Sequence, residues 1–242
     1  MCGRFTITKY QAELLRKHFM AAMAQGLEDA APRYNVAPAA IIPVIRQTSN
    51  GAREAFPAQW GLIPSWARDP AIATSCINAR SETAAEKPAF RTALRQRRCL
   101  IPASGFYEWK RDGKHKQPHY FHLADDEPLA LAGLWETWQA LDGSVRHTTC
   151  ILTTAAYGIM LPIHDRMPVI IPSASWPLWL DVSKCDPAQF TPLYAPLPAL
   201  PLRQYPVSTL VNNARNDSPD LILPIPEAEA ASGPQQSLLF GE

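Results

Sequence analysis

Five short strand-like runs lie close together in the middle of the chain, and they restrict the possible folds more than any other feature. Turn-forming pairs such as Asp112-Gly113 and Asp142-Gly143 separate several of them. Several short strands at such spacing are typical of an antiparallel barrel or sandwich. We therefore expect an α+β protein with an antiparallel β-barrel or sandwich-like core and flanking helices. The runs cover residues 99–102, 105–110, 119–123, 129–134 and 146–154.

The part of the chain before these runs predicts a helix and a β-hairpin. Apolar residues recur at helical spacing up to Gly26, and Thr8 with Gln11 matches a capping box. Residues 9–25 are therefore expected to form an amphipathic helix, with Cys2 on a short strand just before it. The remaining expectations are an extended or looped segment at 33–38, strands at 41–47 and 54–62 joined around residues 49–51, a loop at 62–70 and a mostly helical segment at 82–97.

The C-terminal quarter is rich in proline, with nine of the 24 prolines between residues 187 and 226. The last expected strands are residues 205–210 and 221–225. From residue 227 onward the composition shifts to Ala, Glu, Ser, Gly and Gln, which is typical of disorder. We therefore expect a single domain over residues 1–226 and a disordered tail over 227–242.

Composition excludes several classes of protein. No apolar run reaches the ~18 residues of a membrane-spanning helix, and no secretory leader is visible. Five cysteines form an odd number without a C-x-x-C pair, which indicates a reduced, cytoplasmic protein. The glycine motifs of nucleotide cofactors are missing, and the spacing of His115, His119 and His122 does not favour a metal site, so no cofactor is expected. The formal net charge of +1 means that an anionic partner must meet a local patch.

Cys2 directly follows the initiator methionine, a position with special chemistry. If Met1 is removed, Cys2 carries a free α-amine and a thiol on neighbouring carbons. The amine titrates near pH 7.7–8.0, so a useful fraction of it is nucleophilic at about neutral pH. Such a 1,2-aminothiol can capture an aldehyde as an imine and close it to a thiazolidine, or it can attack an acyl group. Alternatively, Cys2 is only a small residue near a disordered end.

Three further polar residues could support this chemistry. Asn78 can donate and accept hydrogen bonds at once, although an asparagine taken alone is more often a turn residue. Glu108 lies among aromatic residues, where desolvation would raise the pKa of its carboxyl group; the alternative is an edge glutamate paired with Lys110 or Lys114. His164 titrates near neutral pH and could move protons, but a lone histidine is often structural.

Eight lysines and arginines lie between Arg91 and Lys116, against two acidic residues. With Trp66, Tyr107 and Trp109 as stacking surfaces, this segment is typical of a groove for single-stranded nucleic acid. A solvated, charged helix face is the alternative for its first half.

Six motifs in one order resemble the SOS response-associated peptidase (SRAP) family, and the resemblance extends from residue 2 to about 226. Residues 207–208 and 211–213 also match its last strand region. One departure is local: some members have two adjacent tryptophans where this chain has Trp66 and Ala67. The six motifs are MCGRF at residues 1–5, RYNVAP at 33–38, WGLIP at 60–64, NAR at 78–80, GFYEW at 105–109 and HDRMP at 164–168.

The resemblance implies an enzyme of the DNA damage response that senses abasic sites in single-stranded DNA. It implies that Cys2 forms a covalent thiazolidine crosslink with the sugar aldehyde and so protects the lesion, and that Asn78, Glu108 and His164 complete the catalytic set. The expected DNA contacts are Arg4, Asn35, Pro38, Trp66, Arg80, Arg91 and Arg166. Two alternatives remain at this point: an N-terminal-nucleophile cysteine peptidase that needs no DNA, and a non-covalent single-strand binding protein.

The end of the chain carries a separate signal. Gln236, Leu239 and Phe240 lie in the sequence QQSLLF, which is similar to a short peptide that binds a replication sliding clamp. Large apolar residues at the tip of a polar tail have nothing nearby to bury them, which favours docking on a partner. A clamp is therefore an expected partner, with the protein cytoplasmic and associated with the nucleoid when bound to DNA.

Overall fold

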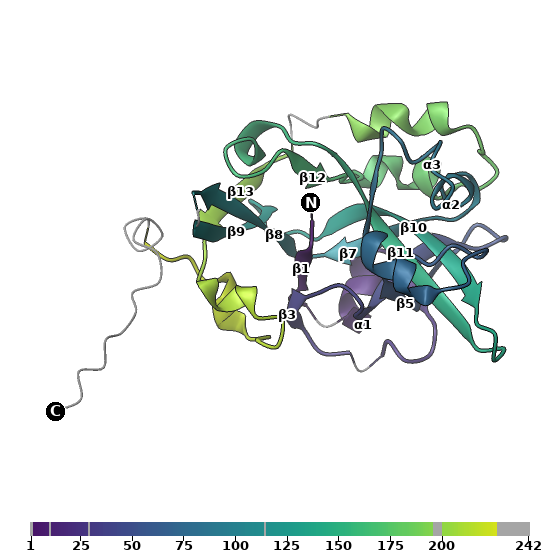
Figure 1. Cartoon of the computed structure of the whole chain (residues 1–242), viewed down its shortest axis with the longest axis horizontal. Helices are drawn as coiled ribbons and strands as arrows, with labels where there is room; N and C mark the ends of the chain where they lie inside the picture. The colour runs from purple at the N-terminus through teal and green to yellow at the C-terminus, as the bar shows by residue number, and fades with distance from the viewer. Residues whose placement is uncertain (1, 10, 29, 114, 196–199, 227–242) are drawn as a thin grey trace.

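The computed structural model describes residues 2–9, 11–28, 30–113, 115–195 and 200–226, and these build two β-sheets with short helices around them (Figure 1). The expected α+β architecture with a barrel core is confirmed. The expected tail, residues 227–242, and with it Gln236, Leu239 and Phe240, lies outside the described residues.

The larger sheet closes into a five-stranded barrel. Its strands are neighbours in the order β11-β10-β7-β4-β5, all antiparallel, and a parallel pairing of β11 with β5 closes the ring. Apolar runs explain why these strands are buried: all six residues of β7 are buried, as expected where both faces are covered. The barrel strands are β4 (Ile41–Gln47), β5 (Arg53–Trp60), β7 (Arg98–Ala103), β10 (Leu129–Gln139) and β11 (Val145–Ala155).

Three short strands extend the barrel. β2 (Ala21–Met23) lies parallel to β5, whereas β6 (Asn78–Arg80) and β12 (Arg166–Pro168) both pair with the end of β11. Because β6 and β12 meet on the same strand, the NAR and HDRMP motifs come together although more than eighty residues separate them.

The second sheet has the strand order β13-β9-β8-β1-β3 and carries the chain's first strand. Side chains alternate along β8, so Phe106 packs in the main core while Tyr107 joins a second apolar cluster. Gly105 opens β8 because a Cβ there would collide with the Tyr120 hydroxyl and the Phe121 carbonyl. The strands are β1 (Arg4–Ile7), β3 (Arg33–Val36), β8 (Gly105–Asp112), β9 (His115–Leu123) and β13 (Leu202–Pro206).

The helices are short. Trp176 and Trp179 are buried on α3, which packs against β7. No helix among the described residues has the length and apolar character needed to cross a membrane. The helical elements are α1 (Gln11–Glu13), η1 (Leu14–His18, a π-helix), α2 (Arg91–Gln96), α3 (Trp176–Leu180) and the 3₁₀ turns η2 (Pro70–Ser75), η3 (Gly158–Met160), η4 (Ser173–Ser175), η5 (Pro187–Tyr194), η6 (Thr209–Asn212) and η7 (Pro219–Ile222).

Four expected elements differ from the structure. The helix expected at 9–25 stops at His18, because the chain reverses at Met20 (φ 50°) and pairs with β5 as β2. The helix expected at 82–97 is confined to α2, since Pro88 lacks the N–H that a continuous helix needs. Of the strand expected at 205–210 only Tyr205 and Pro206 are strand, at the end of β13, and the strand expected at 221–225 is absent because its first two residues belong to η7.

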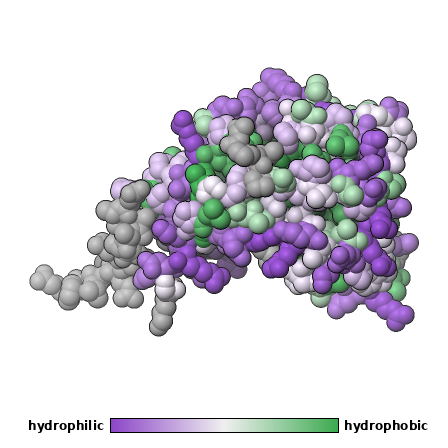
Figure 2. All heavy atoms as spheres, turned by 90° about the horizontal axis from the view of Figure 1, so that it is seen from above, coloured by the Kyte–Doolittle hydropathy of each residue, from purple (hydrophilic) through white to green (hydrophobic). Residues whose placement is uncertain are grey.

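The surface in Figure 2 is a mixture of hydrophilic side chains and smaller hydrophobic patches. Trp66 is among the exposed large apolar residues, at 60% exposure. An exposed ring on a loop is available for stacking, in contrast to the fully buried Trp60 four residues after Phe56 on β5.

Candidate active site

Cys2 lies just before β1 and is completely buried. The Asn78 side-chain amide donates to its carbonyl oxygen at 2.8 Å, and its Sγ contacts the Arg4 carbonyl at 3.9 Å. Cys2 is therefore anchored and is not part of a disordered end. Burial, and after it the charge of Glu108, raises the pKa of the Cys2 thiol, so sulfur is protonated in the resting site.

Asn78 is a strand residue rather than a turn residue, because β6 runs parallel to β11 with Asn78 opposite Ile151. Its Nδ2 is used by the Cys2 carbonyl. Its Oδ1 is buried and accepts no hydrogen bond from the described part of the chain. A buried acceptor of this kind favours a donor close to Cys2.

Glu108 comes from β8, which pairs with β1 through Tyr107 and Arg4. The residue is 2% exposed and lies in ion-pair range of His164, so it is a buried glutamate and not an edge residue. Burial raises the pKa of Glu108 to about 7, although the positive charge of the amino terminus opposes this rise. A carboxyl group with this pKa can both accept and donate a proton near neutral pH.

His164 lies next to Glu108, with Nε2 4.0 Å from Oε2 of the carboxylate. The Arg166 backbone N–H donates to Nδ1 at 2.9 Å, so the proton of the neutral ring sits on Nε2 and faces Glu108. Asp165 also places Oδ1 2.9 Å from Nδ1, a contact that is favourable only when Nδ1 is protonated. Because the Asp165 side chain is 85% exposed and well screened, we assign the neutral tautomer. Burial lowers the pKa of His164, in agreement with this assignment.

Two of the expected DNA contacts have structural partners instead. The Arg4 guanidinium donates to Asn35 Oδ1 at 2.7 Å and to the carbonyls of Val211 and Asn212. Asn35 is 2% exposed, and its Nδ2 donates to the carbonyls of Val211, Asn213 and Asn216. Arg4 and Asn35 therefore hold residues 211–216 in place.

Arg166 is held by Glu82 through two parallel hydrogen bonds of 2.6 and 2.8 Å, and it also donates to the Thr153 carbonyl. The forked face of Arg166, which would suit a phosphate, is thus occupied by a carboxylate. Arg80 lies nearby on β6 and is exposed, and no side-chain hydrogen bond or ion pair among the described residues uses its guanidinium.

The other expected DNA contacts are exposed on separate elements. Pro38 lies in the turn after β3, and Trp66 lies on the loop after β5, where the Trp138 indole N–H fixes the Ala67 carbonyl. Arg91 begins α2, a helix that packs against β7 and β10. These three residues are therefore surface groups outside the cluster of Cys2, Asn78, Glu108 and His164.

A cavity of about 480 Å³ opens beside Glu108 and His164. Trp109 lies in its wall and donates from the indole N–H to Asn212 Oδ1 at 2.7 Å. Reasoning from sequence did not single out Arg111, Lys116 or Asn212, although the first two belong to the basic segment and the third to the matched VNN motif. The cavity is lined by Glu108, Trp109, Arg111, Lys116, His164 and Asn212.

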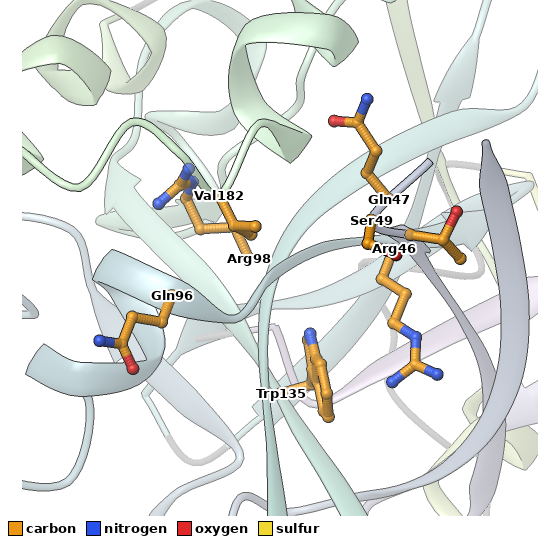
Figure 3. A pocket seen from close by; sticks show the side chains of 8 residues that line it. Arg46, Gln47, Ser49, Gln96, Arg98, Trp135 and Val182 are labelled. Atoms are coloured by element: carbon orange, nitrogen blue, oxygen red, sulfur yellow. The ribbon is translucent and has the colours of Figure 1, made fainter. Parts of the chain in front are cut away.

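A second cavity, of about 370 Å³, lies elsewhere on the barrel, where Arg46 stands beside Trp135 (Figure 3). Its two arginines are already satisfied. Arg46 pairs with Glu54 at 2.8 Å and stacks on Phe56 and Trp135. Arg98 is fully buried and donates to five backbone carbonyls. This cavity therefore offers no uncommitted charge, and the first cavity is the better candidate site.

No group of three His, Cys, Asp or Glu side chains in the described ranges could hold a metal ion.

Comparisons with known proteins agree on one family. The model of the family described as SOS response associated peptidase (SRAP) matches residues 1–214. Abasic site processing protein YoqW of Bacillus subtilis is 41% identical over 225 residues, which cover 92% of this chain and 99% of that protein. Abasic site processing protein YoaM of the same organism is 40% identical over 224 residues, covering 92% and 97%. The crystal structure of a protein from Bacteroides thetaiotaomicron superposes with a TM-score of 0.82 at 24% identity, covering 93% of this chain and all of that one, and shows the same fold.

Proposed function

The chain belongs to the SOS response associated peptidase (SRAP) family, and from this premise we propose that it processes abasic sites in single-stranded DNA by crosslinking them to Cys2. Two relatives at 40–41% identity carry names that describe abasic site processing. The observation that carries the proposal is that four separate segments bring these residues together: Asn78 binds Cys2, the charge of Glu108 reaches the Cys2 thiol, and Glu108 and His164 lie side by side in the wall of one cavity.

The reaction begins once Met1 has been removed and the Cys2 amine is free. The amine attacks the aldehyde carbon of the ring-opened sugar, and the resulting carbinolamine loses water to give an imine. The Cys2 sulfur then adds to the same carbon while its proton passes to nitrogen, which closes a thiazolidine. The balance is one C–N and one C–S bond formed, one C=O bond broken and one water released.

Each neighbouring side chain has a defined part in this sequence. Glu108, with its pKa raised to about 7, takes a proton from the Cys2 ammonium and returns one to the departing water. The His164 Nε2–H donates to the sugar oxygen as the ring opens. Asn78 fixes the Cys2 carbonyl through Nδ2 and accepts from the amine through its uncommitted Oδ1. The desolvated Cys2 thiol stays neutral until the imine forms, so the amine reacts first.

The DNA strand would be held by exposed groups around this centre. Arg80 contacts a phosphate and Trp66 stacks on a base, a contact worth about 1–3 kcal/mol per base. Arg166 can bind a phosphate only by exchanging its Glu82 partner for it. Pro38 and Arg91 extend the path, whereas Arg4 and Asn35 act by shaping the cavity wall at Asn212. Such a protein works in the cytoplasm, at the nucleoid.

A denaturing gel tests the proposal directly. Purified protein is incubated with an oligonucleotide that bears one abasic site, and a shifted, heat-resistant band is expected. Cys2→Ala should give no such band, and neither should an oligonucleotide without the lesion. A second control inserts Ala between Met1 and Cys2, which keeps the thiol but moves the amine away from it. Crosslinking by either altered protein at the wild-type rate would refute the mechanism.

The same gel separates the crosslinking proposal from its two alternatives, because neither of them gives a heat-resistant band. An N-terminal-nucleophile peptidase would cleave a peptide and leave the abasic oligonucleotide unshifted. A non-covalent single-strand binding protein would retain its affinity in Cys2→Ala and form no heat-resistant band.

The C-terminal hexapeptide at residues 235–240 is proposed as a docking peptide for a replication sliding clamp, with Gln236, Leu239 and Phe240 as anchors. Clamp binding would bring the protein to exposed single strands, where abasic sites are met during synthesis.

A further inference from the structure

Two basic residues of the β8–β9 hairpin lie directly opposite each other. In the antiparallel register Arg111 faces Lys116, and both residues are exposed and line the cavity next to Glu108 and His164. Like charges in this position repel each other, at roughly 0.2–1 kcal/mol. The ion pairs of the described residues bring no carboxylate to either of them. An anion bound between the two would remove the repulsion.

Two other arginines near the site already have partners, whereas the exposed Arg80 on β6 does not line this cavity. Arg166 is paired with Glu82, and Arg4 donates to Asn35 and two carbonyls. Arg111 and Lys116 differ from these two residues. They line the cavity, and no acidic side chain among the described residues pairs with them.

We propose that Arg111 and Lys116 form a phosphate subsite for the nucleotide next to the lesion, which holds the strand in the cavity that contains Glu108 and His164. The inference rests on the proposed function and adds the position of the flanking nucleotide to it.

The shape of the cavity fits this occupant. Its volume of about 480 Å³ lies within the range of ~300–1,000 Å³ that is usual for small-ligand sites. Trp109 lies in the wall with its indole N–H fixed on Asn212, so its ring has a defined orientation. A base could stack on this ring while Arg111 and Lys116 bind the adjoining phosphate.

The subsite also lies within electrostatic reach of the reactive residues. Burial is the main cause of the lowered pKa of His164, and the charge of Arg111 adds to the effect. Arg111 and Lys116 line the same cavity as His164 and Glu108, so one nucleotide in this cavity can contact both pairs of residues.

The test measures non-covalent binding, so that it does not depend on crosslinking. The probe is a fluorescent single strand with a tetrahydrofuran residue, an abasic analogue without an aldehyde, and affinity is measured by anisotropy. R111Q/K116Q should bind roughly 10–100-fold more weakly, and its plot of log affinity against log salt should be less steep by about 1. The conservative R111K/K116R should keep the wild-type affinity, and R16Q/K17Q serves as the charge-matched control on η1.

A scan with single methylphosphonate linkages locates the phosphate. At one linkage adjacent to the tetrahydrofuran, the neutral substitution should weaken wild-type binding and leave R111Q/K116Q unaffected, because the contact is already lost. Additive effects at every linkage, or an equal loss in R16Q/K17Q, would overturn the subsite.

Crosslinking to a true abasic oligonucleotide is then measured separately. If neither the wild type nor the variants form a conjugate, the covalent function fails. The comparison of methylphosphonate effects in the wild type and in R111Q/K116Q still tests the role of Arg111 and Lys116. If conjugates form but the methylphosphonate and the R111Q/K116Q substitution weaken binding additively, the subsite fails while the covalent function stands.

Discussion

At the scale of single residues, the buried carboxyl group of Glu108 is the most informative. A folded-state pKa of about 7, raised from the ordinary 4.5, means that the folded protein keeps a proton that the unfolded chain releases. Stability therefore falls as the pH rises between these two values, by up to about 3 kcal/mol in total. A carboxylate that destabilises the fold in this way is typical of a catalytic position.

Replacement of Glu108 by Gln should separate the effect of this carboxyl group on stability from its effect on the crosslinking rate. The variant is expected to have nearly pH-independent stability at this site, and to be more stable than the wild type at pH 8 but not at pH 4. Urea unfolding at both pH values measures this difference. Crosslinking by E108Q should be about 100-fold slower and should lose the rise in rate that the wild type shows through pH 7. A wild-type rate that is flat between pH 6 and 8 would argue against Glu108 as the proton acceptor.

At the scale of elements, the segment around η6 depends on β3 for its position. Asn35 on β3 donates to three carbonyls of this segment, and Asp217 accepts from the backbone N–H groups of Tyr34 and Asn35. Since Asn212 on this segment fixes Trp109, a buried amide on one strand sets the wall of the cavity.

Asn35→Ala should therefore act through structure rather than through lost DNA contact. Removal of the amide leaves several buried partners unsatisfied, and we expect a loss of about 3 kcal/mol in the free energy of unfolding. Limited proteolysis should cut faster near residues 211–217. Asn213→Ala is the matched control, because its backbone carbonyl remains for Asn35, and it should cost less than about 1 kcal/mol. Weakened DNA binding in N35A with unchanged stability would instead restore Asn35 as a direct contact.

At the scale of the whole molecule, the site lies where the two sheets meet. Cys2 and Glu108 belong to the β1–β8 side, whereas Asn78 and His164 are positioned by strands paired with the end of β11. The hydrogen bond from Asn78 to Cys2 joins the two sides. A change that shifts one sheet against the other would separate the four proposed catalytic residues without altering any of them.

Deletion of residues 227–242 tests whether the tail acts apart from this centre. The shortened protein should keep its melting temperature and its crosslinking rate on a free oligonucleotide. It should lose binding to a purified sliding clamp, measured by surface plasmon resonance, and L239A/F240A in the full chain should do the same. Clamp binding that survives both changes would eliminate the docking peptide.

The sequence alone predicted much of the fold, because alternation and turn chemistry are local properties. The barrel strand at 41–47, the hairpin after Gln47 and the strands of both sheets between residues 99 and 154 were expected nearly as they occur. Local signals failed where pairing partners are distant. The apolar spacing of 9–25 is helical, yet Ala21–Met23 gains more as a strand beside β5, a contact that no local pattern contains.

For the proposed site, the residue types indicated which chemistry is possible, and the tertiary structure decided the geometry. Three residue types were visible in the sequence: a cysteine directly after Met1, a glutamate among aromatic residues, and a histidine, whose ordinary pKa is near neutral. Only the fold decided that Cys2 is buried against Asn78, that Asn35 and Arg4 serve the cavity wall, and that Glu82 occupies Arg166. The reason is physical: reactivity begins with the atoms of a side chain, whereas burial, pairing and distance depend on segments that are remote in sequence.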